Sequence, residues 1–381
     1  MAFRARMKVA YLSIHPAPYR DPVLAAVHRR GNLELHVFTM FAGDVGHPYQ
    51  RVVLNEYSNT SLGKGYKLKV PWNSWLHPAI LPALWRGGFD VIVVPGYNHA
   101  TSVLAMLFCW VTNTPLVFSC DAIDFGDQSH RREVLLRFIL KRSAAALVPG
   151  AESRTYLKRL GFSDKRVFEG TYCLDCAVLS EVAAVQRTRR DSIRASLGIS
   201  PTGFAFLFAG RMIPQRGLKY LMQAFGQIST EHSNTFLLLV GTGPDRSDIV
   251  ACSRSIPGVL VLDPLPIEEV AAYYAAADAY VLPSIRETYS LGLAHAAIAS
   301  LPIITTDKVG AAADYVRVGV TGLIVPAGNV EALACAMGQL ATDRAQCVAM
   351  GRTAHDVAMT RTTQWAAEEF ECAAFAAARS Q

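Results

Sequence analysis

The order of apolar segments constrains this chain most strongly. Eleven short runs rich in β-branched and aliphatic residues alternate with longer stretches of helical pattern. Near-continuous apolar strands separated by helices are typical of parallel sheets covered on both faces. The sequence therefore predicts an α/β protein. The expected strands are 8–14, 33–39, 90–96, 115–119, 145–150, 204–210, 235–241, 258–263, 279–284, 302–307 and 322–326.

Eleven strands are too many for one comfortable sheet, so we expect two doubly wound, Rossmann-like domains. The charged segment 181–203 lacks a strand and falls at mid-chain, which favours a linker. The predicted domains are 1–180 and 204–360, followed by a helical segment 361–381. Domains of this kind bind ligands at the carboxyl ends of their strands, here across a cleft where the two domains face each other.

Charge is distributed unevenly between the two halves. The chain has 381 residues and a net charge of +6. Residues 1–180 carry 21 Lys and Arg against 13 Asp and Glu, a net +8, whereas residues 181–381 carry 16 against 18, a net −2. A hydrophobic content of 51% excludes disorder as the main state. The asymmetry is typical of a domain that faces a membrane or a polyanion.

Cellular location is predicted from the cysteines and the apolar runs. Eight cysteines are scattered without a disulfide-like spacing, and the first apolar run is too short for a signal peptide. The apolar stretch 101–119 is interrupted by polar residues and by Pro115, so we expect a buried helix and strand rather than a membrane span. These features predict a cytoplasmic protein with reduced thiols.

The loop after the strand 204–210 carries two arginines. Gly210 ends the strand, Arg211 follows it directly, and Arg216 stands just before an expected helix. Two guanidinium groups beside a helix N-terminus suit a diphosphate. A pair of solvated surface arginines is the alternative.

The loop after the strand 279–284 carries a carboxylate, Glu287. A helix is expected from Ser290 onward, so that the backbone N–H groups of Ser290 and Leu291 are available to phosphate oxygens. His295 lies about 7.5 Å further along this helix. A nucleotide-sugar, in which a sugar, a diphosphate and a ribose follow one another, would match the order of Glu287, the helix start and His295. A buried core position for His295 is an equal alternative.

Several familiar motifs are missing. The glycines at Gly241 and Gly243 lack a third partner, and the loop after the first strand has no glycine, which argues against a dinucleotide-dependent dehydrogenase. The chain has no Walker A motif and no D-x-D carboxylate pair, so neither a P-loop ATPase nor a metal site is expected. Cys173 and Cys176 form a lone C-x-x-C that we interpret as coincidence.

The second half resembles the C-terminal domain of retaining glycosyltransferase family four, the glycogen-synthase-like group of GT-B fold, over about residues 204–340. Five segments follow in the order of that family, and two segments of the first half resemble some bacterial members more weakly. They are 206–225, 237–245, 273–296, 300–316 and 319–333, with 16–39 and 148–175 in the first half. The resemblance implies a last helix that crosses back onto the first domain.

The resemblance also implies roles for single residues. Arg211 matches the arginine that holds the donor diphosphate, and Arg216 stands where a lysine is usual. Glu287 matches the glutamate that binds the donor sugar, and His295 replaces the glutamate that binds the ribose. Asp121 stands where many members have a histidine near the reacting carbon. Gly210, Gly241, Ser290 and Leu291 complete the expected donor site.

A retaining, metal-independent glycosyltransferase of bacterial-type polysaccharide or glycolipid synthesis is the function that this resemblance implies. Its donor would be a UDP- or GDP-linked sugar and its acceptor a glycan or a polyprenyl-phosphate-linked glycan. No other cofactor and no nucleic acid is expected. A sugar-nucleotide epimerase of the same fold and a non-catalytic sugar-nucleotide-binding relative are the alternatives.

The basic first half suggests a peripheral contact with the inner face of the cell membrane. The helical segment 131–142 places Val134, Leu135, Phe138 and Ile139 on one face, among arginines and lysines. Trp72 and Trp75 lie in an expected loop. Together these residues fit a surface near anionic lipid. An ordinary packed helix with a solvated basic side is the alternative.

Overall fold

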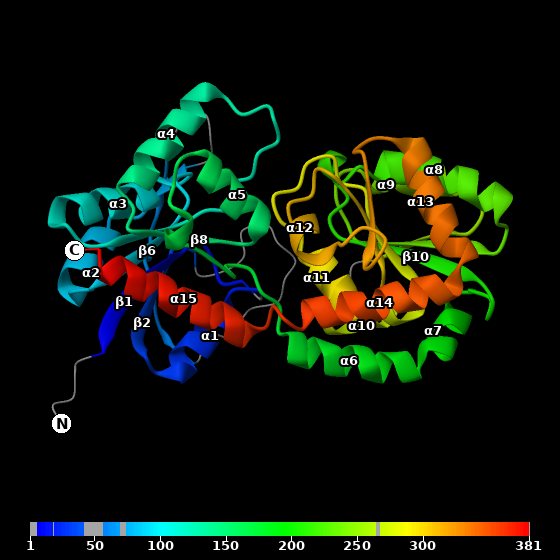
Figure 1. The fold of residues 1–381 in the computed structure, drawn as a ribbon, viewed down its shortest axis with the longest axis horizontal. Coiled ribbons are helices and arrows are strands. Elements are labelled where there is room, and N and C mark those ends of the chain that lie inside the picture. Colours follow the sequence, from blue (N-terminus) through cyan, green and yellow to red (C-terminus); the bar gives the residue numbers. More distant parts are fainter. Residues whose placement is uncertain (1–5, 18, 42–55, 69–73, 264–266, 381) are drawn as a thin grey trace. The chain divides into compact units, whose positions relative to one another are not determined.

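The computed structural model describes residues 6–17, 19–41, 56–68, 74–263 and 267–380. The chain divides into two compact units. Unit 1 contains residues 1–174 and 363–381, and unit 2 contains residues 175–362 (Figure 1). Each unit is an α/β structure with a parallel sheet, as the sequence predicts. No helix within these described ranges is both long and apolar enough to cross a membrane.

Unit 1 contains a seven-stranded parallel sheet in the order β3-β2-β1-β6-β7-β8-β9, and a separate antiparallel pair, β4–β5. Buried aliphatic residues fill the central strands β1, β6 and β7 on both faces. The strands are β1 (Met7–Ser13), β2 (Leu33–Thr39), β3 (Ser58–Ser61), β4 (Tyr66–Leu68), β5 (Ser74–Leu76), β6 (Val91–Pro95), β7 (Leu116–Ser119), β8 (Ala145–Val148) and β9 (Val167–Glu169).

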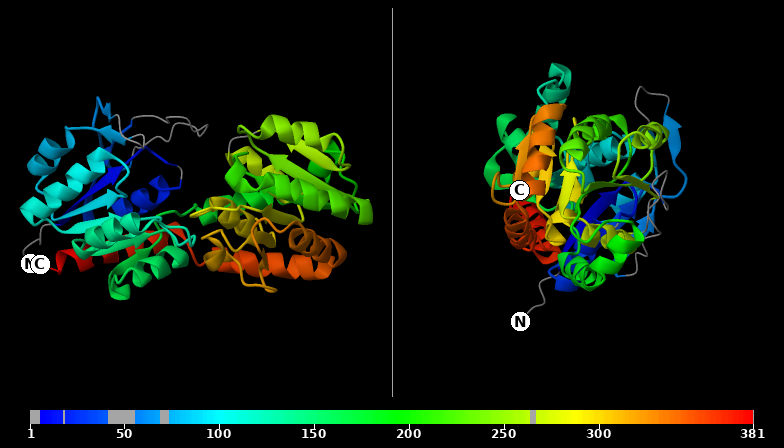
Figure 2. Two further views of the ribbon diagram at one scale, coloured as in Figure 1. Left: turned by 90° about the horizontal axis from the view of Figure 1, so that it is seen from above. Right: turned by 90° about the vertical axis from the view of Figure 1, so that its right-hand side faces the viewer.

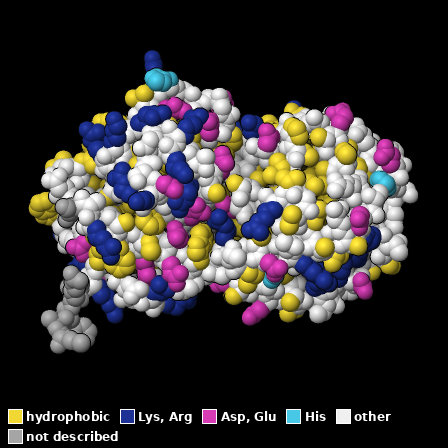
Figure 3. Space-filling model, viewed as in Figure 1, with side chains coloured by type: hydrophobic (Ala, Val, Ile, Leu, Met, Phe, Trp, Pro, Cys, Tyr) yellow, Lys and Arg dark blue, Asp and Glu magenta, His cyan; other side chains and the backbone are white. Residues whose placement is uncertain are grey.

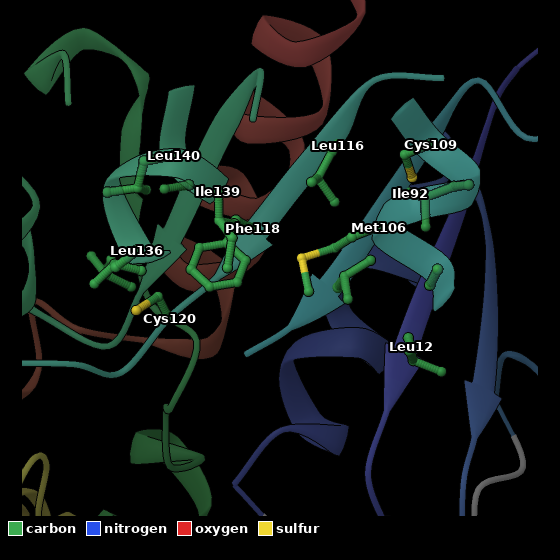
Figure 4. Packing of buried hydrophobic residues seen from close by; sticks show 14 of the residues in the cluster. Leu12, Ile92, Met106, Cys109, Leu116, Phe118, Cys120, Leu136, Ile139 and Leu140 are labelled. Atoms are coloured by element: carbon green, nitrogen blue, oxygen red, sulfur yellow. The ribbon is translucent and has the colours of Figure 1, made fainter. Parts of the chain in front are cut away.

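Helices cover this sheet and close its core. They are α1 (Asp21–Arg30), α2 (Ile80–Gly87), α3 (Ala100–Thr112), α4 (His130–Lys141), α5 (Ala151–Arg159) and α15 (Thr363–Ala378). Figure 4 shows Phe118 of β7 facing Ile139 and Leu140 of α4, with Met106 of α3 on the neighbouring part of the same core. Ser129 caps α4 by accepting a hydrogen bond from the backbone N–H of Arg132.

Unit 2 contains a six-stranded sheet in the order β12-β11-β10-β13-β14-β15, with every pair parallel. Its strands are β10 (Phe204–Ala209), β11 (Thr235–Val240), β12 (Val259–Leu262), β13 (Ala279–Leu282), β14 (Ile303–Thr306) and β15 (Gly322–Val325). Its helices are α6 (Cys176–Thr188), α7 (Arg190–Ser196), α8 (Leu218–Glu231), α9 (Arg246–Ser253), α10 (Ile267–Ala276), α11 (Leu291–Ile298), α12 (Ala312–Tyr315), α13 (Val330–Thr342) and α14 (Arg344–Ala358).

The last helix, α15, belongs to unit 1, although unit 2 precedes it in the sequence. Its buried face joins the core of unit 1 and packs against β8 and β9, and Figure 2 shows the helix in red along this unit. The buried carboxylate of Glu371 accepts hydrogen bonds from Arg30 Nε at 3.0 Å and from Asn32 Nδ2. These contacts connect the end of the chain to α1 and to the start of β2, as the predicted return of the last helix requires.

The expected linker 181–203 is largely helical instead. It falls mostly within α6 and α7, which belong to unit 2. The physical reason is Asp278, which precedes β13 and accepts hydrogen bonds from Arg190 at 2.7 Å and from Arg194 at 3.1 Å. Arg194 is buried and also donates to the carbonyl oxygen of Gly203 at 2.6 Å. The charged residues that suggested a solvated linker therefore attach α7 to the sheet.

Replacing Arg194 by Met should destabilise unit 2, because several buried oxygens lose their donor. We expect a loss of about 3 kcal/mol, or about 6–12 °C in Tm. Thermal unfolding of the purified chain measures this, with Arg352→Met on the exposed face of α14 as the matched control. Equal melting temperatures for the two variants would contradict the role of Arg194.

Candidate functional site

Three loops meet at the carboxyl edge of the unit 2 sheet. They follow β10, β11 and β13, and backbone hydrogen bonds join them. Met212 N–H donates to Thr242 at 2.8 Å, and Ile285 N–H donates to Gln215 at 2.9 Å. The backbone of Glu287 is paired with the loop after β14, donating to Lys308 and accepting from Gly310, each at 3.0 Å. The loop after β14 thus holds the Glu287 backbone through both its N–H and its carbonyl oxygen.

Glycine allows two of these close approaches. Gly217 has φ +68°, and a Cβ there would collide with the carbonyl oxygen of Pro283. A Cβ on Gly241 would likewise collide with the carbonyl oxygen of Gly210. The predicted donor-site glycines Gly210 and Gly241 therefore lie in contact. The missing side chain of Gly241 lets the two loops pack closely.

Arg216 and Glu287 form an ion pair across this edge. Arg216 Nη1 lies 2.7 Å from Glu287 Oε2, and the two side chains are only 15% and 14% exposed. Arg216 Nε is buried and makes no hydrogen bond within the described part of the chain. The geometry thus brings together two residues that are 71 positions apart and that the sequence predicts to act on one ligand.

Arg211 lies at the same edge, directly after the end of β10, and its side chain is exposed. The loop between Arg211 and Arg216 ends in a short 3₁₀ turn, Pro214–Arg216, before α8. The predicted pair of guanidinium groups therefore divides into one exposed group and one that is held by a carboxylate.

The N-terminus of α11 is also at this edge. Ser290 is its N-cap residue, is buried, and makes no side-chain capping hydrogen bond. Leu291 begins the helix and is half-buried. The first-turn N–H groups of a helix have no intrahelical acceptors, and the helix dipole adds positive potential there. The helix start therefore lies where the sequence predicts it, and anion binding by Ser290 and Leu291 stays a prediction.

His295 occupies a core position. It is 6% exposed, and its ring stacks on that of Tyr274 in α10 at a centroid distance of 4.1 Å. Burial lowers the pKa of His295 to about 4, so the imidazole is neutral at pH 7. Of the two interpretations that the sequence left open, the structure favours the core histidine.

Asp121 lies in unit 1, after β7, and is exposed. Its Oδ2 accepts a hydrogen bond from the hydroxyl of Tyr172 at 3.4 Å. It therefore belongs to the carboxyl edge of the other sheet, together with Tyr19, which meets Tyr172 edge to face at 5.1 Å.

His99 is a residue that the sequence analysis missed. It precedes α3 at the carboxyl edge of the unit 1 sheet, after β6. Its Nδ1 is buried and has no hydrogen-bond partner among the described residues. Burial, and then the neighbouring His77, lower its pKa. A histidine directly after a predicted strand was the available signal.

No group of three or more His, Cys, Asp or Glu side chains that could hold a metal ion occurs in the described part of the chain. Cys173 and Cys176 are both buried, and the Cys176 thiol contacts the backbone carbonyl oxygens of Ala358 and Arg361.

Comparison with known families matches part of the second unit. Residues 203–343 match the family described as glycosyl transferases group 1. A D-inositol 3-phosphate glycosyltransferase of Rhodococcus erythropolis is 32% identical over 163 residues, which are 40% of this chain and 37% of that protein. The protein of that name from Pseudarthrobacter chlorophenolicus is 25% identical over 91% of this chain and 90% of its own length. Several other relatives are matched over less than half of their length.

Solved structures resemble the chain in fold. Anabaena Alr3699/HepE in complex with UDP has a TM-score of 0.73 at 15% identity, covering 96% of this chain and 98% of that one. WaaG, a glycosyltransferase involved in lipopolysaccharide biosynthesis, has a TM-score of 0.62 at 16% identity with the same coverage. Residues 203–343 therefore match the group 1 glycosyl transferases, and the chain as a whole has the fold of GT-B glycosyltransferases.

Proposed function

We propose that this chain is a cytoplasmic, retaining glycosyltransferase that moves a sugar from a UDP- or GDP-linked donor to a glycan or polyprenyl-phosphate-linked acceptor. One observation carries the proposal. Arg216 and Glu287 are paired at 2.7 Å, on the edge of the sheet where Arg211 and the N-terminus of α11 also lie. Cationic groups for a diphosphate and a carboxylate for a sugar are thus adjacent.

The diphosphate is assigned to the positive groups. Arg211 is exposed and can approach phosphate oxygens, and the N–H groups at Ser290 and Leu291 supply further donors. Negative charge grows on the diphosphate as the bond to the sugar breaks. Fixed donors that stabilise this charge lower the barrier, and the proposal needs no metal ion for that step.

Glu287 is assigned to the sugar. A carboxylate accepts hydrogen bonds from two hydroxyls at once, which fixes the orientation of the ring. The ion pair with Arg216 holds the Glu287 carboxylate in place. The bond between the anomeric carbon and the diphosphate oxygen breaks, and the acceptor oxygen forms its bond on the same face. The acceptor proton passes to the departing oxygen.

The acceptor is assigned to unit 1. Asp121 and His99 both lie at the carboxyl edge of its sheet, where α/β domains bind their ligands. The net +8 of the first 180 residues suits an acceptor that carries phosphate.

HepE has been solved with UDP-glucose, which supports a nucleotide-sugar donor for this chain.

A panel of nucleotide-sugars tests the assignment, with UDP-glucose and GDP-mannose as the first two donors. We expect slow release of UDP or GDP without an acceptor. Arg211→Ala and Glu287→Ala should each reduce this release by at least about 10²-fold, because a group that stabilises the transition state is lost. The control Arg352→Ala should behave as the wild type.

Other products of the same panel would overturn the proposal. Conversion of the donor into an isomeric nucleotide-sugar would identify an epimerase. Binding without release or conversion would identify a sugar-nucleotide-binding protein.

Arg216→Lys should preserve most of the activity, whereas Arg216→Met should not. Lysine keeps the charge beside Glu287, although it loses the planar fork of the guanidinium. Methionine leaves a carboxylate that is 14% exposed without its cation. We expect UDP affinity, measured by calorimetry, to fall at least about tenfold for Met and a few-fold for Lys. An equal loss of UDP affinity in both variants would show that the positive charge at position 216 does not determine UDP binding.

His295 should make stability depend on pH. Its pKa is about 4 in the folded chain and about 6.5 when unfolded, so only the unfolded chain takes up a proton between these values. The free energy of unfolding should therefore fall by about 2–3 kcal/mol from pH 7 to pH 4.5, beyond the fall shown by His295→Phe. Urea unfolding of both chains at both pH values measures the difference. Identical pH dependence would mean that His295 is solvated.

A further inference from the structure

Three neighbouring helices of unit 1 expose large hydrophobic side chains in regular stripes. On α3 the exposed residues are Val103, Leu107 and Val111, spaced four apart and thus on one face. Val111 is 82% exposed. On α2 the corresponding pair is Leu81 and Trp85, and Trp85 is 73% exposed. These helices bury their opposite faces against the sheet, so the stripes are a second apolar face.

The third helix, α4, has the same property. Leu136, Ile139 and Leu140 are buried, whereas Val134, Leu135 and Phe138 are exposed. The sequence placed Ile139 on the exposed face, but the structure buries it in the core (Figure 4). The exposed apolar residues of α4 are therefore not the ones that hold this helix to the sheet.

Aromatic contacts join the stripes into one surface. Trp85 of α2 meets Phe108 of α3 edge to face at 6.5 Å, and Trp110 of α3 meets Phe138 of α4 in the same way at 5.6 Å. We name the surface formed by the exposed residues of these helices the α2–α4 surface. It consists of Leu81, Trp85, Val103, Leu107, Val111, Val134, Leu135 and Phe138. Exposed apolar side chains that gather on one part of a surface mark an interaction site more often than scattered single ones do.

Positive charge accompanies this surface. Arg86 is the one charged residue of α2, and α3 has none. On α4 and directly after it, exposed basic residues outnumber the single acidic residue, Glu133, which pairs with Arg159 at 2.5 Å. The exposed basic residues here are Arg131, Arg132, Arg137, Lys141 and Arg142. Figure 3 shows Lys and Arg side chains beside hydrophobic ones over this part of unit 1.

We propose that the α2–α4 surface binds the interface of an anionic lipid bilayer. Charge complementarity favours a bilayer over a second copy of the chain on this surface. A second copy would bring like charges together, whereas anionic lipid headgroups neutralise them. Trp85 suits the boundary between headgroups and acyl chains, because indole is apolar with one polar group. Arg142 stacks over the Phe138 ring at 3.8 Å and thus combines both chemistries at one position.

This surface differs from the one suggested by the sequence. Trp72 lies outside the described residues, and Trp75 packs edge to face on Phe41 at 5.2 Å. Trp85 and the stripe on α3 take their place. None of these residues belongs to the edge where the donor is assigned, so this proposal stands independently of the proposed function.

Sedimentation with lipid vesicles tests the proposal. The chain should bind vesicles of phosphatidylcholine with phosphatidylglycerol, and bind pure phosphatidylcholine much more weakly. The pair Trp85→Ser and Val111→Ser should weaken binding at least about tenfold through lost apolar burial. The pair Arg86→Glu and Lys141→Glu should weaken it at least about tenfold, with a smaller dependence on salt.

Matched controls come from α14 of unit 2. Val348→Ser removes an apolar side chain that is also exposed, and Arg352→Glu reverses an exposed charge. Both should bind vesicles as the wild type does. Donor hydrolysis in solution should be unchanged in all these variants, which separates a failure of this proposal from a failure of the proposed function.

Tryptophan fluorescence reports which residue enters the bilayer. Emission should shift to shorter wavelength when anionic vesicles are added, and Trp85→Phe should remove most of that shift while binding persists. Three results would overturn the proposal: no binding to anionic vesicles, equal loss of binding in the α14 controls, or a lipid-free dimer in sedimentation velocity that Trp85→Ser dissociates.

Discussion

Parallel pairing of β10 with its neighbours is the constraint on which the candidate site depends. In a parallel sheet every strand ends at the same edge, so Ala209 pairs with Val240 and the chain leaves both strands side by side. Leu207 pairs with Tyr280, which brings the end of β13 to the same place. Arg216 and Glu287 can therefore meet, although 70 residues separate them. Their ion pair is a consequence of strand direction as much as of charge.

The two units use positive charge in different ways. In unit 2 the net charge of the sequence is slightly negative, and its important arginines each have a defined place: Arg194 on buried oxygens and Arg216 on Glu287. In unit 1 the excess of positive charge lies partly on an exposed surface beside apolar side chains. A site for a small diphosphate needs few, well-directed donors, whereas attraction to a charged surface depends on the sum of many.

The sequence was sufficient to predict the sheet strands that apolar runs mark, and all eleven occur in the structure. It was insufficient for β3, β4, β5 and β9, because β3 is fully exposed and the other three have only three residues each. Spacing and resemblance identified Arg216 and Glu287 as neighbours in function, but not as an ion pair. The segment 181–203 was predicted wrongly because composition does not show that Arg190 and Arg194 have Asp278 as a partner. The sequence also did not predict which apolar residues of α4 are exposed. Periodicity alone does not distinguish the buried Ile139 from the exposed Phe138.

The placement of α15 has a consequence for biosynthesis. Unit 2 is a continuous segment, residues 175–362, whereas unit 1 is composed of both ends of the chain. As the chain emerges from the ribosome, unit 2 has all its residues available while unit 1 still lacks Phe370 and Glu371. The hydrogen bonds of Arg30 and Asn32 with Glu371 can form only after all of unit 2 has been synthesised. Unit 1 is thus completed only after unit 2 has been synthesised, and a translation product that ends before α15 would leave the unit 1 sheet uncovered where α15 packs.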